Sequence, residues 1–263
     1  MQRIFEDTLK VWKSSGMNKP LIIIGARQIG KTYTIEKFCK ENFENYLYFN
    51  LEKDVEIAKI FENTLKPEEI IKNIEVRLEK TIDIDNTIMF FDEVQVSERF
   101  ITSLKYFCES ANNYKIICAG SLLGVKLNRF NSSFPVGKVE MEHMFPMSFK
   151  EFLIALNQTM LIDEIYYHYQ NMIPMAEDLH EKALILYKHY LIVGGMPEAV
   201  KSYIECGQDI VKFNRDIVKT IVEMYISDMN KYTINKNESV KIEKVYMSIP
   251  RELAKENKKF QYS

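Results

Sequence analysis

A glycine-rich segment near the start of the chain has the residue types and spacing to hold a phosphate group. Four aliphatic residues lead into Gly25-Ala26-Arg27-Gln28-Ile29-Gly30-Lys31-Thr32, which has the spacing G-x-x-x-x-G-K-T. Gly25 and Gly30 carry no side chain, so backbone N–H groups can converge on an anion there. Lys31 can then reach the β- and γ-phosphates of a nucleotide, and the Thr32 hydroxyl can ligate Mg²⁺.

This spacing predicts a P-loop, with every residue from Gly25 to Tyr33 taking part in nucleotide binding. The alternative is an ordinary turn between a strand and a helix that contains two glycines. The flanking residues favour the P-loop. The aliphatic run before it is typical of a buried parallel strand, and residues 33–40 contain neither Gly nor Pro, as a helix requires.

Two adjacent carboxylates, Asp92 and Glu93, end a second hydrophobic run at residues 87–91. At the end of a strand beside the P-loop, Asp92 is suited to hold Mg²⁺ through its water shell. Glu93 is suited to orient and polarise an attacking water. A strand followed by a merely acidic loop is the alternative, but the P-loop upstream favours the catalytic interpretation. The pair also fits hydrolysis better than transfer to a hydroxyl group.

Two further polar residues are candidates with an open alternative. Gln95 could help to position the water or could be a plain surface glutamine. Ser121 follows the predicted strand 115–119, where its hydroxyl could sense the γ-phosphate or could cap the next helix. The candidate catalytic residues are therefore Glu93, Lys31 and Ser121, and the candidate Mg²⁺ ligands are Thr32 and Asp92.

The order of the remaining elements predicts an α/β protein with a parallel sheet and covering helices over residues 1–146. A short helix is expected within residues 4–15, strands at 46–50 and 139–144, and helices between 55 and 80 and at 104–109. Three cations, Lys126, Arg129 and Lys138, lie between the last two strands. One of them is expected to act in trans across a homo-oligomer contact.

Beyond residue 146 the pattern changes to helices only, so residues 147–234 are expected to form a helical lid. Ser148 and Glu151 have the spacing of a capping box, and helices are expected at 162–172, 177–192, 197–205 and 209–231. The aromatic run 166–169 could stack on bases, but helix packing is the favoured interpretation. The pair Gly194-Gly195 reads as a flexible turn before a helix that starts at Pro197.

Composition and charge exclude several classes of protein. The chain has 263 residues, 46% hydrophobic and 27% charged, with 35 Lys and Arg against 37 Asp and Glu. Charges this nearly balanced give no overall attraction to nucleic acid or to a membrane. No apolar stretch approaches the ~20 residues of a membrane span, and the N-terminus is unlike a signal peptide, so we expect a cytoplasmic protein with no membrane partner. The spacing of the four cysteines and four histidines favours free thiols and no structural zinc.

Five segments together resemble one family, the prokaryotic AAA-type ATP-binding proteins with a C-terminal domain of unknown function, similar to archaeal ATPases and STAND-like P-loop proteins. They are the P-loop, Phe91-Asp92-Glu93-Val94-Gln95, Ala119-Gly120-Ser121, residues 145–152 and Gly194-Gly195-Met196-Pro197. The resemblance implies an additional-strand P-loop core, a helical lid, a winged-helix region and a nuclease-like C-terminal domain that residues 1–263 do not include.

The resemblance also implies roles for individual segments. It puts Pro197 against the adenine of ATP. Residues 235–263 are expected to be a linker and the first helices, at 240–247 and 251–257, of a winged-helix region that continues beyond the chain, and a DNA or protein partner is expected through that missing part. Many members have Gly-Arg where this chain has Gly137-Lys138. That departure weakens an arginine-finger role, because Lys cannot make the bidentate contact of Arg.

Two functions follow from these patterns. The first is Mg²⁺-dependent ATP hydrolysis that drives a conformational change between core and lid. The second is a slow nucleotide-gated switch or scaffold, in which binding alone carries the signal. A DNA-associated role rests only on the family analogy. The adjacent carboxylates at 92 and 93 favour the first function.

Overall fold

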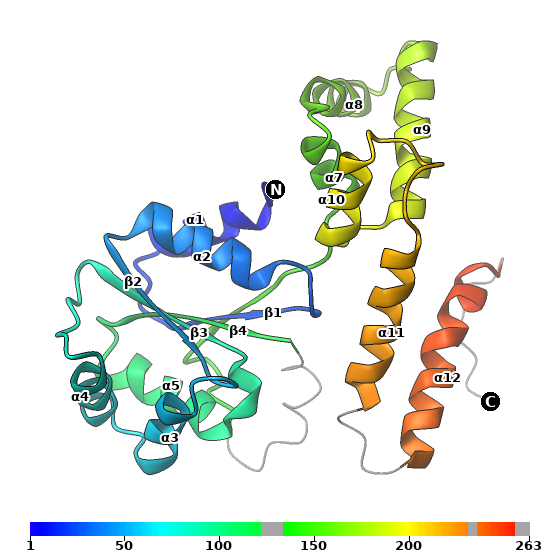
Figure 1. The fold of residues 1–263 in the computed structure, drawn as a ribbon. Helices are drawn as coiled ribbons and strands as arrows, with labels where there is room; N and C mark the ends of the chain where they lie inside the picture. The colour runs from blue at the N-terminus through cyan, green and yellow to red at the C-terminus, as the bar shows by residue number, and fades with distance from the viewer. Residues whose placement is uncertain (122–133, 231–235, 256–263) are drawn as a thin grey trace. The chain divides into compact units, whose positions relative to one another are not determined.

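The computed structural model describes residues 1–121, 134–230 and 236–255 (Figure 1). Its five strands are β1 (Leu21–Ile24), β2 (Asn45–Asn50), β3 (Thr87–Asp92), β4 (Lys115–Gly120) and β5 (Glu140–His143). They form one sheet in the order β2-β3-β4-β1-β5, and every neighbouring pair is parallel. Strand β4 therefore lies between β1 and β3, which is the additional-strand arrangement that the resemblance implies.

Helices cover both faces of this sheet (Figure 1). They are α1 (Phe5–Ser14), α2 (Lys31–Asn42), α3 (Val55–Asn63), α4 (Pro67–Leu78) and α5 (Glu98–Ser110). Alternate residues of one strand point to opposite faces. Ile23 packs in one hydrophobic cluster with residues of α1 and α2, whereas Ile22 packs in a second cluster with residues of α3, α4 and α5. The predicted α/β core is confirmed.

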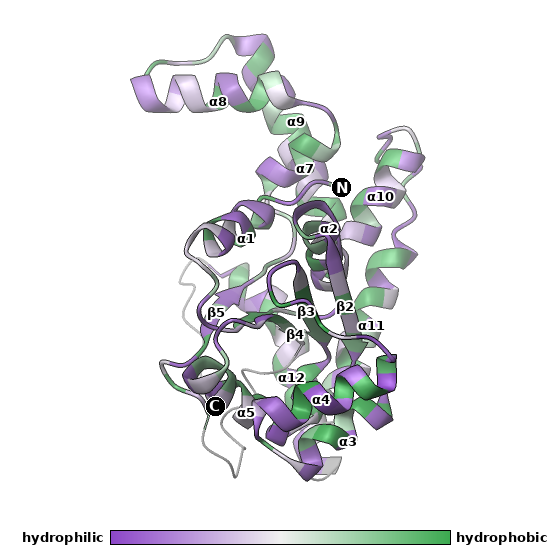
Figure 2. Cartoon of the chain, turned by 90° about the vertical axis from the view of Figure 1, so that its left-hand side faces the viewer, coloured by the Kyte–Doolittle hydropathy of each residue, from purple (hydrophilic) through white to green (hydrophobic). Residues whose placement is uncertain are grey.

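The two-sided cover explains why the central strands read as continuous apolar runs. Every residue of β1 and β3 is buried, whereas the edge strand β5 is half-buried or exposed throughout. The hydropathy colouring shows the same contrast between β4, which is hydrophobic, and β5, which is hydrophilic (Figure 2). A parallel strand with helices on both faces has no solvent side on which to place polar residues.

An all-α region follows the sheet, as the sequence predicts. It contains α7 (Phe149–Ala155), α8 (Thr159–Asn171), α9 (Glu177–Val193), α10 (Pro197–Glu205), α11 (Asp216–Asn230) and α12 (Lys236–Leu253). The predicted capping box is confirmed, because the Ser148 side chain accepts from the Glu151 amide and the Glu151 side chain accepts from the Ser148 amide. The predicted start of α10 at Pro197 is confirmed as well.

Three expectations for this region are wrong. The helix expected at 209–231 begins only at Asp216, and before it the Asp209 carboxylate accepts from the Val211 amide at 2.9 Å in a turn. The tyrosines of the aromatic run lie largely at the surface and not in a helix interface, since Tyr167 and Tyr169 are 56% and 76% exposed. One helix, α12, replaces the two expected at 240–247 and 251–257, and Pro250 lies inside it. Proline lacks the N–H donor and its ring crowds the preceding turn, but the Pro250 carbonyl still accepts from the Ala254 amide at 3.1 Å, so helical hydrogen bonding continues beyond it.

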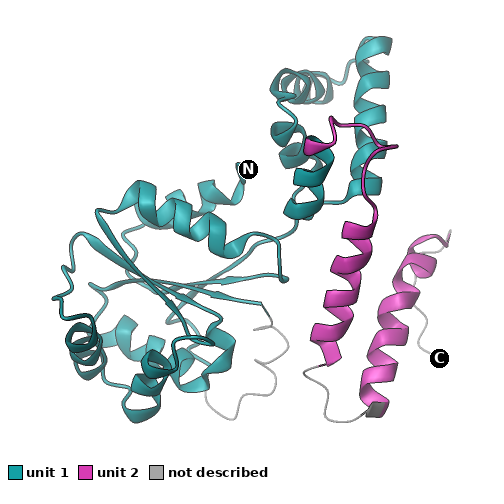
Figure 3. Ribbon diagram, in the orientation of Figure 1, with its two compact units in different colours: residues 1–204 teal, residues 205–263 magenta. Residues whose placement is uncertain are grey.

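The chain divides into two compact units, residues 1–204 and 205–263 (Figure 3). The sheet, its covering helices and α7 to α9 all belong to the first unit. The divisions expected at residues 146 and 234 stay predictions. Across the described residues, no helix combines the length and the apolar character that crossing a membrane would need.

Candidate nucleotide-binding site

The predicted P-loop connects the end of β1 to the start of α2, and its two glycines are required for different reasons. Gly30 has a φ of 89°, a left-handed conformation that side chains disfavour. Gly25 lies against Met144, the residue after β5, because a Cβ built on it would be only 2.3 Å from the Met144 carbonyl oxygen. The loop is therefore sharply curved at one end and tightly packed at the other.

The Lys31 side chain folds back over this loop. Its Nζ donates to the carbonyls of Gly25, at 2.9 Å, and Ala26, at 2.7 Å. Burial lowers the pKa of Lys31 to about 8, although the nearby carboxylates of Glu93 and Asp92 act in the opposite direction. A phosphate group held in the loop would likewise favour the charged ammonium.

The Thr32 hydroxyl and the Asp92 carboxylate meet where the P-loop faces the end of β3. Thr32 Oγ1 donates to Asp92 Oδ2 at 2.7 Å, and the Tyr48 hydroxyl reaches the same oxygen at 3.3 Å. Burial raises the pKa of Asp92, and the hydrogen bond from Thr32 opposes that effect. The tyrosine has no sequence motif, so only the pairing of β2 with β3 reveals its place beside Asp92.

These oxygen atoms fit a magnesium ion. Mg²⁺ prefers oxygen ligands, and it usually takes one or two from the protein and the rest from phosphates and water. Thr32 and Asp92 supply such a pair. The described residues contain no group of three His, Cys, Asp or Glu side chains that could hold a metal without other ligands.

A chain of side-chain contacts links Glu93 to the end of β4. Gln95 Nε2 donates to Glu93 Oε2, and Gln95 Oε1 accepts from the Ser121 amide at 3.3 Å. Gln95 is only 2% exposed, so the surface-glutamine alternative is wrong. Glu93 itself has a φ of 53°, which is uncommon for a residue other than glycine and often marks a functional position.

Ser121 also faces the P-loop, because Arg27 Nε donates to its Oγ at 3.4 Å. The structure thus brings residues from the ends of β1, β3 and β4 together at one edge of the sheet, which is where ligands bind in open α/β folds. The residues after Ser121 lie outside the described part, so its alternative role as a helix cap stays open. Two of the candidate trans cations, Lys126 and Arg129, also lie there.

The third candidate cation, Lys138, lies in the described part of the chain. Its Nζ forms an ion pair with Glu109 at 3.0 Å, and both side chains are about two-fifths exposed. Pairs this exposed break readily in water. The ion pair with Glu109 therefore does not decide whether Lys138 acts in trans, and that role stays a prediction.

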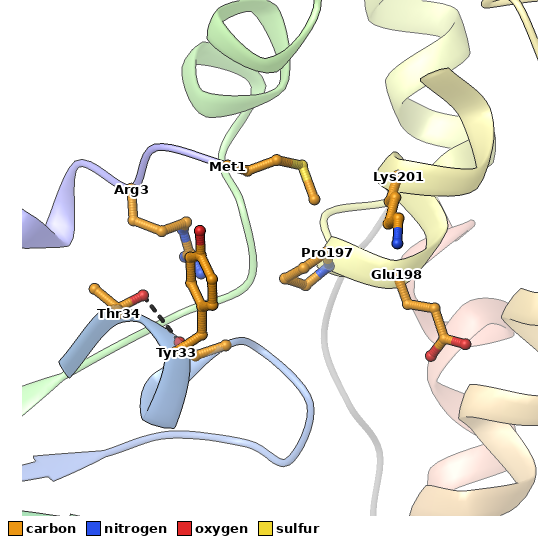
Figure 4. Close-up of a pocket in the computed structure, with 8 residues that line it drawn as sticks. Met1, Arg3, Tyr33, Thr34, Pro197, Glu198 and Lys201 are labelled. Carbon is orange, nitrogen blue, oxygen red and sulfur yellow. Dashed lines mark hydrogen bonds between the residues drawn. The ribbon is translucent and has the colours of Figure 1, made fainter. Parts of the chain in front are cut away.

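A cavity of about 320 Å³ opens beside the P-loop (Figure 4). It is lined by Met1, Arg3, Gly30, Tyr33, Thr34, Pro197, Glu198 and Lys201. The Tyr33 ring and the Pro197 ring face the same space in Figure 4. Pro197 Cγ lies 3.7 Å from where a Cβ on Gly30 would be, so the helix α10 begins directly beside the phosphate loop.

Several residues of this cavity belong to no sequence motif. Met1 and Arg3 stand before the first helix, and Glu198 and Lys201 belong to α10. These four residues share no motif. Glu198 and Lys201 could have been found only because they follow Pro197 closely in the sequence. Contacts between segments so far apart are decided by the tertiary fold.

Comparison with solved structures finds matches of low sequence identity. A Walker-type ATPase of Pyrococcus abyssi is 16% identical, with 95% of this chain and 77% of that chain covered and a TM-score of 0.48. C. elegans PCH-2 is 14% identical, with 72% and 55% covered and a TM-score of 0.37. Cdc6p from Pyrobaculum aerophilum is 14% identical, with 58% and 47% covered and a TM-score of 0.37. Similarities this weak carry no argument about activity.

Family models are more informative. No curated protein matches the chain. The model of a domain of unknown function matches residues 184–263, and the model of an AAA domain matches residues 17–153, which is just over half of the chain and includes the whole sheet. The chain therefore belongs to the AAA domain family.

Proposed function

We propose that this protein binds ATP with Mg²⁺ in the P-loop and hydrolyses it, and that hydrolysis changes the arrangement of the core, residues 1–146, and the helical lid, residues 147–234. One observation carries the proposal. The Thr32 hydroxyl and the Asp92 carboxylate, 60 residues apart in the sequence, are in direct contact at 2.7 Å beside the Lys31 ammonium. This is the set of groups that a nucleotide–magnesium complex requires.

The substrate contacts follow from the positions of the side chains. The backbone from Gly25 to Thr32 and the Lys31 ammonium bind the phosphates, and Tyr33 continues the binding segment into α2. Pro197 packs against the adenine in the adjoining cavity, whose lining joins it to Tyr33. Mg²⁺, held by Thr32 and Asp92, would neutralise charge on the phosphates.

Glu93 is the residue we assign to water activation. Its carboxylate can take the proton of the attacking water, and the amide of Gln95, buried behind it, holds that carboxylate in one orientation. Ser121 completes the contact to the P-loop through Arg27. A hydroxyl there can bind the γ-phosphate, so that the end of β4 responds to whether this phosphate is present.

Turnover by the isolated chain is expected to be slow. A cation supplied in trans is worth roughly 10³–10⁵ in rate in other phosphoryl-transfer enzymes, and such a contact needs a homo-oligomer. Rapid turnover by a dilute monomer would show that no such cation is needed. Phosphate release should therefore be measured across protein concentration, and with and without DNA to test for a nucleic-acid partner.

Two substitutions separate an ATPase from a binding-only switch. Lys31→Ala should weaken ATP binding and hydrolysis together. Glu93→Gln keeps the side-chain volume but loses the negative charge, so ATP should bind normally while turnover falls by roughly 10²–10⁴. Glu44→Gln is the matched control, since Glu44 is exposed in the turn before β2. Wild-type turnover by a Glu93→Gln protein that binds ATP would make the nucleotide-gated switch the better proposal.

A further inference from the structure

Arg3 uses three different nitrogen atoms to contact three separate parts of the first unit. Its Nε donates to Glu151 Oε1 at 2.8 Å, in the first turn of α7. Its Nη1 donates to the Ile29 carbonyl in the P-loop at 2.5 Å. Its Nη2 donates to the Phe145 carbonyl at 2.6 Å, in the segment that leads from β5 to α7. One guanidinium thus joins the P-loop to the start of the helical region.

Glu151, the partner of Arg3, also accepts hydrogen bonds from two backbone amides. Its Oε1 also accepts from the Ile4 amide at 2.9 Å, and its Oε2 accepts from the Ser148 amide at 2.8 Å. The second contact is half of the capping box that begins α7. The same carboxylate therefore fixes the N-terminal segment and the first turn of the lid.

Because the Arg3–Glu151 pair is buried, its stability depends strongly on the positions of both side chains. The side chains of Arg3 and Glu151 are only 5% and 7% exposed. An unpaired charge at such a depth is strongly unfavourable, because water cannot reach it. The pair therefore responds to a displacement of either side chain, whereas an exposed ion pair would exchange its partner for water.

The contact with the P-loop falls at its most constrained point. Ile29 lies between Gln28, with a φ of 62°, and Gly30, with a φ of 89°. A residue with left-handed backbone therefore stands on each side of the one whose carbonyl Arg3 holds. Arg3 Nη1 also lies 3.7 Å from where a Cβ on Gly30 would be, and the side chain lines the cavity with Pro197.

We propose that Arg3 is a positioning residue that couples nucleotide binding at the P-loop to the position of the lid, through Ile29 on one side and Glu151 on the other. This inference rests on the proposed function, because it needs a nucleotide in the P-loop. It predicts that ATP binding tightens the lid connection and that loss of the arginine contacts weakens ATP binding.

The test compares Arg3→Lys with wild type in the full chain. Lysine keeps a cation for Glu151, but its single nitrogen cannot also hold the carbonyls of Ile29 and Phe145. Arg99→Lys is the matched control. Arg99 Nε donates to the Phe61 carbonyl at 3.0 Å and pairs with Glu62 at 3.9 Å, so it joins α5 to α3 and contacts neither the P-loop nor the lid through these groups. The Kd for ATP with Mg²⁺ and the hydrogen exchange of the amides of Ile4, Phe145 and residues 147–151 are measured for all three proteins.

The coupling gives a specific result. In wild type, ATP should slow exchange at Ile4 and across residues 145–151. In Arg3→Lys the Kd should rise about tenfold, as expected for the loss of hydrogen bonds to a charged group, and ATP should no longer slow exchange at the lid connection. Arg99→Lys should behave as wild type in both measurements. A purely structural role would lower stability with and without ATP and leave the Kd unchanged.

Three outcomes would overturn the inference. The first is wild-type Kd and wild-type protection in a folded Arg3→Lys protein. The second needs no variant: wild type that binds ATP without any change in exchange at Ile4 and residues 145–151 has no coupling to transmit. The third, wild type that does not bind ATP at all, would remove the proposed function and this inference together, and the Kd measurement distinguishes it from the other two.

Discussion

The replacement of Gly195 by alanine tests why two glycines precede Pro197. A Cβ on Gly195 would lie 2.2 Å from the Met147 carbonyl oxygen and 3.0 Å from the Met147 nitrogen. The Met147 amide donates to the Gly195 carbonyl at 2.7 Å, and the Tyr190 hydroxyl donates to the Met147 carbonyl at 2.8 Å. The second glycine is therefore required for close backbone approach, in addition to any flexibility of the pair.

The size of the effect follows from these distances. Ordinary van der Waals contact begins at 3.4 Å, so 3.4 minus 2.2 gives a displacement of 1.2 Å for the added methyl group. Overpacking of this kind costs about 1–3 kcal/mol, and a weakened backbone hydrogen bond adds about 1 kcal/mol. We expect Gly195→Ala to lose about 2–4 kcal/mol of unfolding free energy. In a chain of this size that is a fall of roughly 4–16 °C in Tm.

Thermal unfolding followed by circular dichroism measures this loss, and an ATP titration follows its effect on the cavity. Because Pro197 is two residues away, ATP affinity should fall as well. Gly137→Ala is the control, since Gly137 has a φ of 74° and nothing within 4 Å of its added Cβ. It should cost only the backbone strain, about 1–2 kcal/mol, and leave ATP affinity unchanged. Equal Tm values for the two variants, or wild-type ATP affinity in Gly195→Ala, would refute the close-approach argument.

Three further predictions use other contacts. Gly25→Ala should push the P-loop away from the Met144 carbonyl, 2.3 Å from the new Cβ, and should weaken ATP binding at least as much as it lowers Tm; undiminished binding would contradict this. Burial alone would raise the pKa of Glu151, but its hydrogen bonds with the Arg3 guanidinium and the backbone outweigh burial and lower the pKa below its ordinary 4.5. A lowered pKa gives stability that is present above pH 4.5 and lost as pH falls, so the difference in unfolding free energy between wild type and Glu151→Gln should narrow below pH 4.5; a constant difference would count against the pair. Tyr48→Phe removes a donor to Asp92 and should raise the Mg²⁺ concentration for half-maximal ATP binding by about tenfold, whereas no change would show that this contact is incidental.

Much of the candidate site is determined by the sequence alone. The spacing from Gly25 to Thr32 specifies the loop, and the apolar run that ends at Asp92 specifies the strand beside it. The capping box at Ser148 specifies where α7 begins. Each of these signals spans fewer than ten residues. Local hydrogen bonding and the period of the side chains are enough to produce the structure from them.

Only the tertiary structure decides the contacts between these segments. Arg3 and Glu151 meet across 148 residues of sequence, and nothing in the types of either residue indicates the other. Gln95 is buried rather than exposed because the ends of β3 and β4 enclose it, and the role of Tyr48 depends on the pairing of β2 with β3. The physical reason is the same in each case. A parallel sheet brings together strand ends that are far apart in the chain, and the order of the strands is set by the packing of both faces at once.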